Sequence, residues 1–147
     1  MDKYCVSLEL AKQLKEAGWK KETEFWWGKL KTNMCNTIYA YEILHLNEDG
    51  NFVPLDYINI SDNIVSKKDC KFYPAPLATE ILELLPNIIN PIDDNCRGHY
   101  LSISPSVSIK GWQVCYGGYR AKVFIDKSLP NVLAKTWIYL KKEGLIK

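Results

Sequence analysis

The chain lacks the features that mark membrane-spanning and secreted proteins. No apolar run approaches the roughly 18 residues that cross a bilayer, and the stretch from Met1 to Cys5 contains no apolar signal core. The 5 cysteines are odd in number, irregularly spaced and never arranged as Cys-x-x-Cys. This pattern fits reduced, mostly buried thiols in a cytosolic protein. We therefore expect a cytoplasmic protein with no membrane contact and no metal or other cofactor.

A strong excess of one charge is also missing. The formal net charge is only +2, and no dense basic stripe of the kind that binds phosphates occurs. Between Glu42 and Ser66 there are five acidic residues and no Lys or Arg. We interpret this stretch as a solvated acidic surface.

The composition is that of a folded globular protein. The chain has 147 residues, of which 47% are hydrophobic and 24% are charged, so disorder is not expected. A chain of this length buries enough surface to fold without disulfides or metals. No repeat or linker divides it, and we predict a single domain over residues 1–147.

Three segments have the apolar spacing and flanking residues of helices, at about 8–17, 76–85 and 129–143. Ser7 and Ser128 are predicted N-caps of the first and last helix, and Gly18 and Gly144 follow their ends. In the last helix only Ile138 is an apolar residue on the side predicted to face outward.

The middle helix, about 76–85, is predicted to begin with Pro76 in its first turn. Apolar residues cover most of its circumference, and only three of its positions are polar. Such a helix should be nearly enclosed, either by its own domain or by a partner.

The remaining segments favour strands. Residues 24–28, 37–46 and 52–60 are rich in aromatic and β-branched residues, and Asp49-Gly50 marks a hairpin turn between the last two. Pro54 should then lie at an edge or a bulge. Residues 100–104, 112–116 and 119–125 form a second group, in which Leu101 and Ile103 should face the apolar positions of 112–116. We predict an α+β fold: one antiparallel sheet of about 4–6 strands, with the helices packed mostly on one face.

No catalytic constellation is recognisable. Cys96 and His99 could form a nucleophile and its base, oriented by Asp93 or Asp94, or half of a zinc site. A lone Cys-x-x-His lacks the second ligand pair, however, and two unrelated loop residues explain it better. We therefore predict no enzyme activity and assign no catalytic, metal or cofactor residue.

The aromatic residues are the other resource of the sequence, with 5 Trp and 9 Tyr. Most should fill the core. If helices cover only one face of the sheet, however, some rings must lie on the open face, where they could stack bases or bind a partner's side chains. The residues that we select as a candidate binding surface are Trp26, Tyr39, Tyr41, Lys29 and Lys31, with Lys20 and Lys21 nearby.

The three helical blocks read VSLELAKQLKEAGW, APLATEILELLP and SLPNVLAKTWIYLKKEGLI. These blocks, in the order helix, aromatic strand, helix, hairpin, helix, resemble a family of small proteins carried by phages and by prophages of gut bacteria. The resemblance implies a fold and a genomic setting, but the family has no assigned activity and supplies no catalytic position.

Two functional hypotheses follow. The first is a non-enzymatic accessory protein that binds a host or phage protein, either as a monomer or as a homodimer. The second is a binder of single-stranded nucleic acid or nucleotides that uses exposed strand aromatics and lysines.

Overall fold

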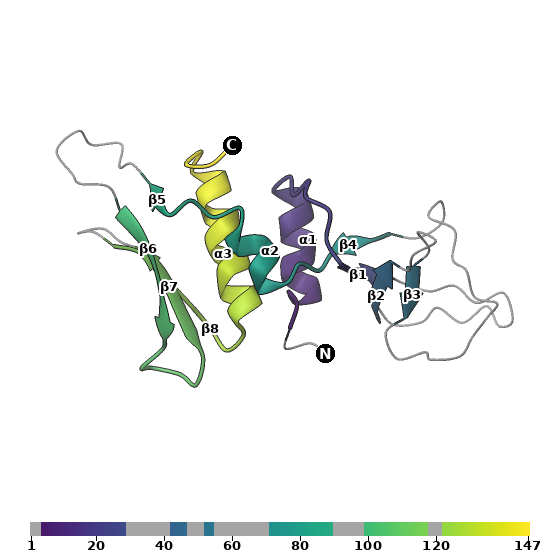
Figure 1. Ribbon diagram of the computed structural model, residues 1–147, viewed down its shortest axis with the longest axis horizontal. Helices are drawn as coiled ribbons and strands as arrows, with labels where there is room; N and C mark the ends of the chain where they lie inside the picture. The colour runs from purple at the N-terminus through teal and green to yellow at the C-terminus, as the bar shows by residue number, and fades with distance from the viewer. Residues whose placement is uncertain (1–3, 29–41, 47–51, 55–70, 90–98, 118–121) are drawn as a thin grey trace, which may run out of the picture. The chain divides into compact units, whose positions relative to one another are not determined.

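The computed structural model describes residues 4–28, 42–46, 52–54, 71–89, 99–117 and 122–147 (Figure 1). The chain divides into two compact units, one of residues 7–77 and one of residues 1–6 together with 78–147. Each unit combines at least one helix with an antiparallel sheet, which confirms the predicted α+β class. The strands form two four-stranded sheets instead of the one sheet that we predicted. The assignment of residues 1–147 to a single domain stays a prediction.

The unit of residues 7–77 contains one helix and one sheet. Helix α1 spans Leu8–Glu16, and the strands are β1 (Phe25–Gly28), β2 (Glu42–Leu46), β3 (Phe52–Pro54) and β4 (Tyr73–Pro74). The strand order is β3-β2-β1-β4, and each neighbouring pair is antiparallel. The predicted hairpin is confirmed by the pairing of β2 with β3, and Pro54 lies on an edge strand as expected.

Helix α1 begins and ends where its flanking residues predict. Leu10, Ala11 and Leu14 are buried, and Gly18 has a φ of 88°, in the left-handed region. The N–H of Trp19 donates to the carbonyl of Leu14 at 2.9 Å, and the N–H of Gly18 donates to Lys15 at 3.1 Å. These two bonds form a Schellman motif, which satisfies carbonyls that the helix end leaves open.

Strand β4 was not predicted, because two residues that include a proline show no alternation. The strand is held by pairing with β1 and by the N–H of Ala75, which donates to the carbonyl of Phe25 at 2.9 Å. On β1, a Cβ at the buried Gly28 would lie 2.6 Å from the side chain of Leu44. A side chain at position 28 would therefore force the side chain of Leu44 on β2 and the ring of Phe72 to move.

The second unit contains α2 (Ala78–Leu82), β5 (Ile88–Ile89), β6 (His99–Pro105), β7 (Trp112–Tyr116), β8 (Val123–Asp126) and α3 (Leu129–Lys142). The strand order is β5-β6-β7-β8, again antiparallel throughout. Helix α3 lies along one face of this sheet, against β7 and β8, and also packs on α2 (Figure 1). Leu101 pairs with Tyr116 and Ile103 with Val114, so the predicted facing of these two strands is confirmed.

Ile138 is a correction, because the sequence placed it on the outward side of α3. Its side chain is only 5% exposed. Helix α3 is covered on more than one side, since within its unit it contacts both the sheet and α2, whereas the helical pattern was interpreted with one covered side. Its predicted C-terminal glycine is confirmed: Gly144 has a φ of 69°, and the N–H of Leu145 donates to the carbonyl of Leu140 at 2.9 Å.

Helix α2 is also shorter and more exposed than predicted. It begins at Ala78 and not at Pro76. The chain before it is still bonded to the sheet of residues 7–77, because the N–H of Ala75 donates to the carbonyl of Phe25 on β1. After Leu82 the chain continues as a turn up to Leu85, with no further α-helical residue. Ile81 and Leu85 are buried, but Leu84, just after the helix, is exposed, so the chain itself does not enclose the whole predicted segment, and enclosure by a partner stays a prediction.

Candidate binding face on the C-terminal sheet

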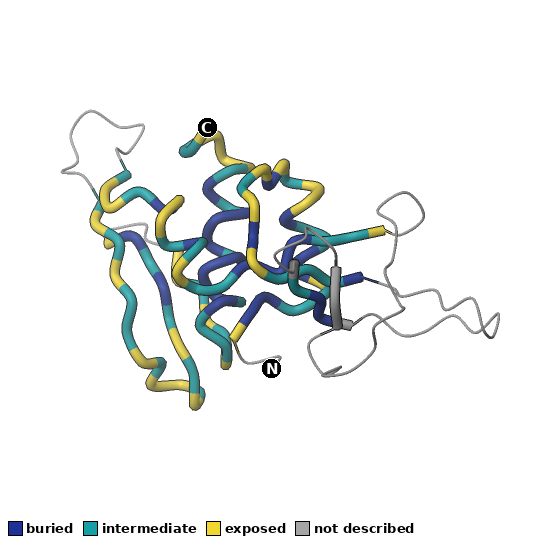
Figure 2. Tube along the Cα trace, turned by 45° about the vertical axis from the view of Figure 1, so that its right-hand side comes forward, coloured by how far each residue is buried: buried dark blue, intermediate teal, exposed yellow. Residues whose placement is uncertain are grey.

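The alternation of side chains along β6, β7 and β8 gives this sheet two faces of different character. One face packs on α3 and contains Val114 and Tyr116, which are buried, and Phe124, whose ring lies 5.4 Å from that of Tyr139 on α3. The opposite face carries the intervening residues of each strand. Within this unit the described residues place no helix on that opposite face, and exposed positions alternate with less exposed ones along much of β6 and along β8 (Figure 2).

We call this second face the open face. Cross-strand pairing brings its side chains into rows: Ile88 lies opposite Tyr100, Ser102 opposite Cys115 and Val123, and Ser104 opposite Gln113 and Ile125. Four of its residues are large and exposed, namely Tyr100 at 66%, Val123 at 49%, Ile88 at 46% and Ile125 at 38%. They are half of the exposed large apolar residues in the part of the chain that the structure describes.

The open face has an apolar border on two sides and a small polar centre. Ile88 and Tyr100 lie on β5 and β6, whereas Val123 and Ile125 lie on the edge strand β8. Between them Nε2 of Gln113 donates to Oγ of Ser104 at 3.0 Å. Cys115 is a half-buried free thiol in the same centre. None of the eight side chains of the open face carries a formal charge.

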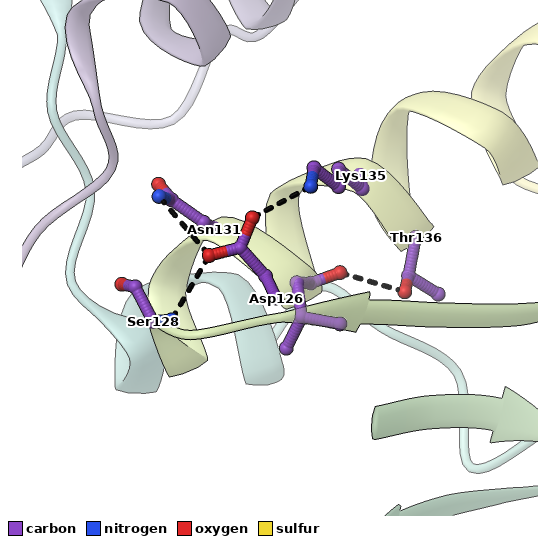
Figure 3. Close-up of polar contacts among 6 residues, drawn as sticks. Asp126, Ser128, Asn131, Lys135 and Thr136 are labelled. Carbon is purple, nitrogen blue, oxygen red and sulfur yellow. Dashed lines mark hydrogen bonds and ion pairs between the residues drawn. The ribbon is translucent and has the colours of Figure 1, made fainter. Parts of the chain in front are cut away.

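Strand β8, which carries Val123 and Ile125, is fixed by its last residue, Asp126 (Figure 3). Its Oδ1 accepts a hydrogen bond from the backbone N–H of Ser128 at 2.9 Å, and its Oδ2 accepts one from Nζ of Lys135 at 2.6 Å. Nδ2 of Asn131 also donates to Oδ1, at 3.5 Å. The carboxylate thus connects β8 to the first turns of α3.

The protonation of Asp126 follows from these contacts. Burial by itself favours the neutral acid, but the hydrogen bonds from Lys135, Ser128 and Asn131 and the positive charge of Lys135 outweigh it. The pKa of the Asp126 carboxyl is therefore lowered, and the group is ionised at neutral pH. A negative charge at this place also suits the positive end of the helix dipole of α3.

Ser128 has the predicted N-cap position but not the predicted chemistry. Its hydroxyl makes no capping hydrogen bond and is buried without a hydrogen-bond partner among the described residues. The carboxylate of Asp126, two residues earlier, takes over the role of binding a backbone N–H at the helix start. Sequence reasoning missed Asp126, because a cap is sought at the position directly before the apolar pattern begins.

The β5 side of the open face is fixed by Tyr116. Its side chain points to the helix-covered face, and its hydroxyl donates to the carbonyl of Pro86 at 2.7 Å. Burial raises the pKa of Tyr116 to about 12, so the phenol stays neutral and remains a donor. This bond ties the segment before β5 to the centre of the sheet and so positions Ile88 beside Tyr100.

The residues chosen from the sequence do not form this face. Trp26 lies on β1 in the other unit, is half-buried, and its indole N–H donates to the carbonyl of Thr23 at 3.0 Å. Its neighbours Phe25 and Trp27 are half-buried as well. Four predicted members, Tyr39, Tyr41, Lys29 and Lys31, lie outside the described residues.

The members of the open face that sequence reasoning missed could have been found by alternation. On β6 the apolar Leu101 and Ile103 were predicted to face the apolar positions of 112–116, which leaves Tyr100 on the other side. The same rule applied to β8, with Phe124 inside, places Val123 and Ile125 outside.

The Cys96–His99 hypothesis is only partly accessible. Cys96, Asp93 and Asp94 lie outside the described residues, whereas His99 begins β6 and its Nδ1–H donates to the carbonyl of Gly117. Across the described part of the chain, no three His, Cys, Asp or Glu side chains are grouped to hold a metal ion. Nor does any described helix have the length and apolar character needed to cross a bilayer.

Comparison with known proteins adds no relative to these observations. No family model, curated protein or solved structure matches the chain. The functional argument therefore depends on the open face itself.

Proposed function

We propose that the chain is a non-enzymatic protein-interaction module and that the open face of the β5–β8 sheet is its binding surface. The observation that carries this proposal is the absence of charge from an exposed sheet face. Charged residues make up 24% of the chain, so about two of the eight side chains would be charged if they were spread evenly. A face left to water normally has polar and charged residues alternating with the buried ones.

The residues present are those that bind protein surfaces well. Tyr100 exposes about two thirds of its surface, and an aromatic side chain of this size offers roughly 100–150 Å² to a partner. At about 25 cal/mol per Å², covering it contributes roughly 3 kcal/mol before the entropic cost of association. Tyrosine can also donate a hydrogen bond from its hydroxyl, which is one reason that it is enriched in interfaces.

The partner that we propose is a host or phage protein in the cytoplasm. The support for this setting is the resemblance of the three helical blocks to small phage and prophage proteins, together with the free thiols of Cys5 and Cys115. An uncharged face selects a partner surface of matching shape and low charge, because a charged partner group would be buried without a counter-ion.

Nucleic-acid binding is the less supported alternative. No described lysine or arginine lies on the open face, whereas a surface that stacks bases needs cations beside its rings to bind the phosphates. The group Trp26, Tyr39, Tyr41, Lys29 and Lys31 stays a prediction.

The proposal is tested by capture from lysate of the native host with the tagged full chain and two matched variants. Y100A and I88A, each on the open face, should lose a stoichiometric protein that the wild type retains. V107A is the control, because Val107 is fully exposed but lies on the β6–β7 turn, outside the face. Equal capture by all variants would contradict the assignment of the face. Nucleic acid in the eluate that leaves with rising salt would favour the alternative instead.

A further inference from the structure

The edge of the second sheet at β8 offers a further binding site. Strand β8 pairs with β7 on one side, and no strand in the described residues pairs with its other side. An unpaired edge presents backbone N–H and C=O groups that can pair with another strand. We propose that two copies of this chain associate through antiparallel pairing of their β8 edges, which joins two four-stranded sheets into one of eight strands.

Symmetry allows only a few registers for such a pair. Along a strand, successive residues direct their backbone hydrogen-bonding groups alternately to one neighbour and to the other. A two-fold axis perpendicular to the sheet therefore has to place one residue opposite itself. Within β8 the central residue is then Val123, Phe124 or Ile125.

The register centred on Phe124 pairs both charges and apolar residues. Lys122 then lies opposite Asp126 of the second copy, on the face that carries α3. Val123 lies opposite Ile125 of the second copy, on the open face, where both are exposed in the single chain. Opposite charges and apolar pairs directly across a strand pair are each stabilising.

The other two registers lack this complementarity. Centring on Ile125 places Asp126 opposite Phe124 and Lys127 opposite Val123, so two charges lie against apolar residues. Centring on Val123 places Lys122 opposite Phe124. Charge complementarity thus selects one register and one occupant, a second copy of β8.

The lysine before β8 does not guard the edge. Lysines on edge strands often prevent pairing by extending across the edge into water. Here the ammonium group of Lys122 lies 4.2 Å from the ring centre of Tyr139 and 5.6 Å from that of Phe124. It therefore lies on the helix-covered face, close to where Asp126 of the second copy would be.

The helices also leave room for the pair. Helix α3 lies over both β7 and β8, and neighbouring strands are about 4.8 Å apart. The two-fold axis then brings the two α3 helices to roughly 10 Å from each other, which is a packing distance for helices. The dimer and the proposed partner are tested separately: Val123 and Ile125 belong to the open face, but the partner test changes Tyr100 on β6 and Ile88 on β5, which take no part in the β8 pairing.

The dimer is tested with the full chain by sedimentation equilibrium over a wide range of protein concentration. We expect a concentration-dependent monomer–dimer equilibrium for the wild type. The double variant V123K/I125K should raise the dissociation constant at least tenfold, whereas Y100K, on the same face but on β6, should leave it unchanged. A wild type that is monomeric at every concentration, or a double variant that dimerises like the wild type, would overturn the proposal.

Cysteine cross-linking tests the register. The background is C115S, because Cys115 lies opposite Val123 in the same chain and would form an intramolecular disulfide. Under mild oxidation, V123C mixed with I125C should give a disulfide-linked dimer above the level of the C115S parent, and neither variant alone should do so. Cross-linking of V123C alone or of I125C alone would show one of the other registers and overturn the one proposed.

Discussion

The carboxylate of Asp126 is expected to be among the most important polar groups for the stability of the C-terminal unit. The test compares the stability of D126A with that of D126N and K135M. D126A removes the acceptor for the N–H of Ser128 and the partner of Lys135 at once. D126N keeps an oxygen for Ser128 but loses the charge, so it separates capping from ion pairing.

The magnitudes follow from these two contacts. Loss of a helix-capping acceptor costs about 0.5–2 kcal/mol. The ion pair is worth less, about 0.2–1 kcal/mol, because the Lys135 side chain is 38% exposed and solvent screens it. D126A should therefore lower the free energy of unfolding by roughly 1–3 kcal/mol, and D126N and K135M by about 1 kcal/mol or less.

The assay is urea unfolding followed by far-UV circular dichroism at low protein concentration, at neutral pH and in acid. Because the pKa of Asp126 is lowered in the folded chain, its ionisation stabilises the fold above the unfolded value of about 3.9. This contribution is lost as the pH falls through the folded pKa, so wild type and D126N should converge in acid. A D126A variant as stable as the wild type, or a difference from D126N that is the same at every pH, would refute the reasoning.

Two further changes test how the sheet is held. G111A should destabilise the chain by about 1–3 kcal/mol, because a Cβ at Gly111 would lie 2.7 Å from the backbone Cα of Lys127, which cannot move aside. Urea unfolding measures this difference. A G111A variant as stable as the wild type would show that the β6–β7 turn adapts. Y116F should cost about 1–2 kcal/mol at neutral pH, since the carbonyl of Pro86 loses its donor. Because burial raises the pKa of Tyr116 to about 12, the wild type should also lose up to roughly 2–3 kcal/mol as the pH rises from about 10 to 12. Y116F should lack that loss, and parallel pH profiles of the two proteins would contradict the assigned burial.

The helices were the most predictable part of the fold, because their ends are specified by single residues. Gly18 and Gly144 have the positive φ that a helix terminus favours, and both ends were placed within one residue. Helix α2 was overestimated, since apolar residues continue beyond Leu82 into a turn that has no distinct signal of its own. The two-residue strands β4 and β5 were missed, because two residues cannot show a period.

The number of sheets was the main feature that local patterns could not supply. Both groups of strands were recognised as hairpins, but no local pattern states whether one hairpin continues the sheet of another. The same limit applies to Ile138, which is buried: α3 packs on α2 as well as on the sheet, and helical periodicity describes only one covered side.

The candidate site shows why aromatic content alone is a poor guide to binding surfaces. Among the strand aromatics, Tyr116 is buried under α3 and Trp26 is tied to the backbone of Thr23, so neither is a free stacking platform. Tyr100 was not selected, although its neighbours Leu101 and Ile103 were correctly predicted to face the apolar positions of β7. Once those two share a face with Val114 and Tyr116, the opposite positions of β6 are fixed, and their lack of charge can be read directly from the sequence. The informative signal is therefore the missing lysines and glutamates at outward positions, because a solvated strand would have included them.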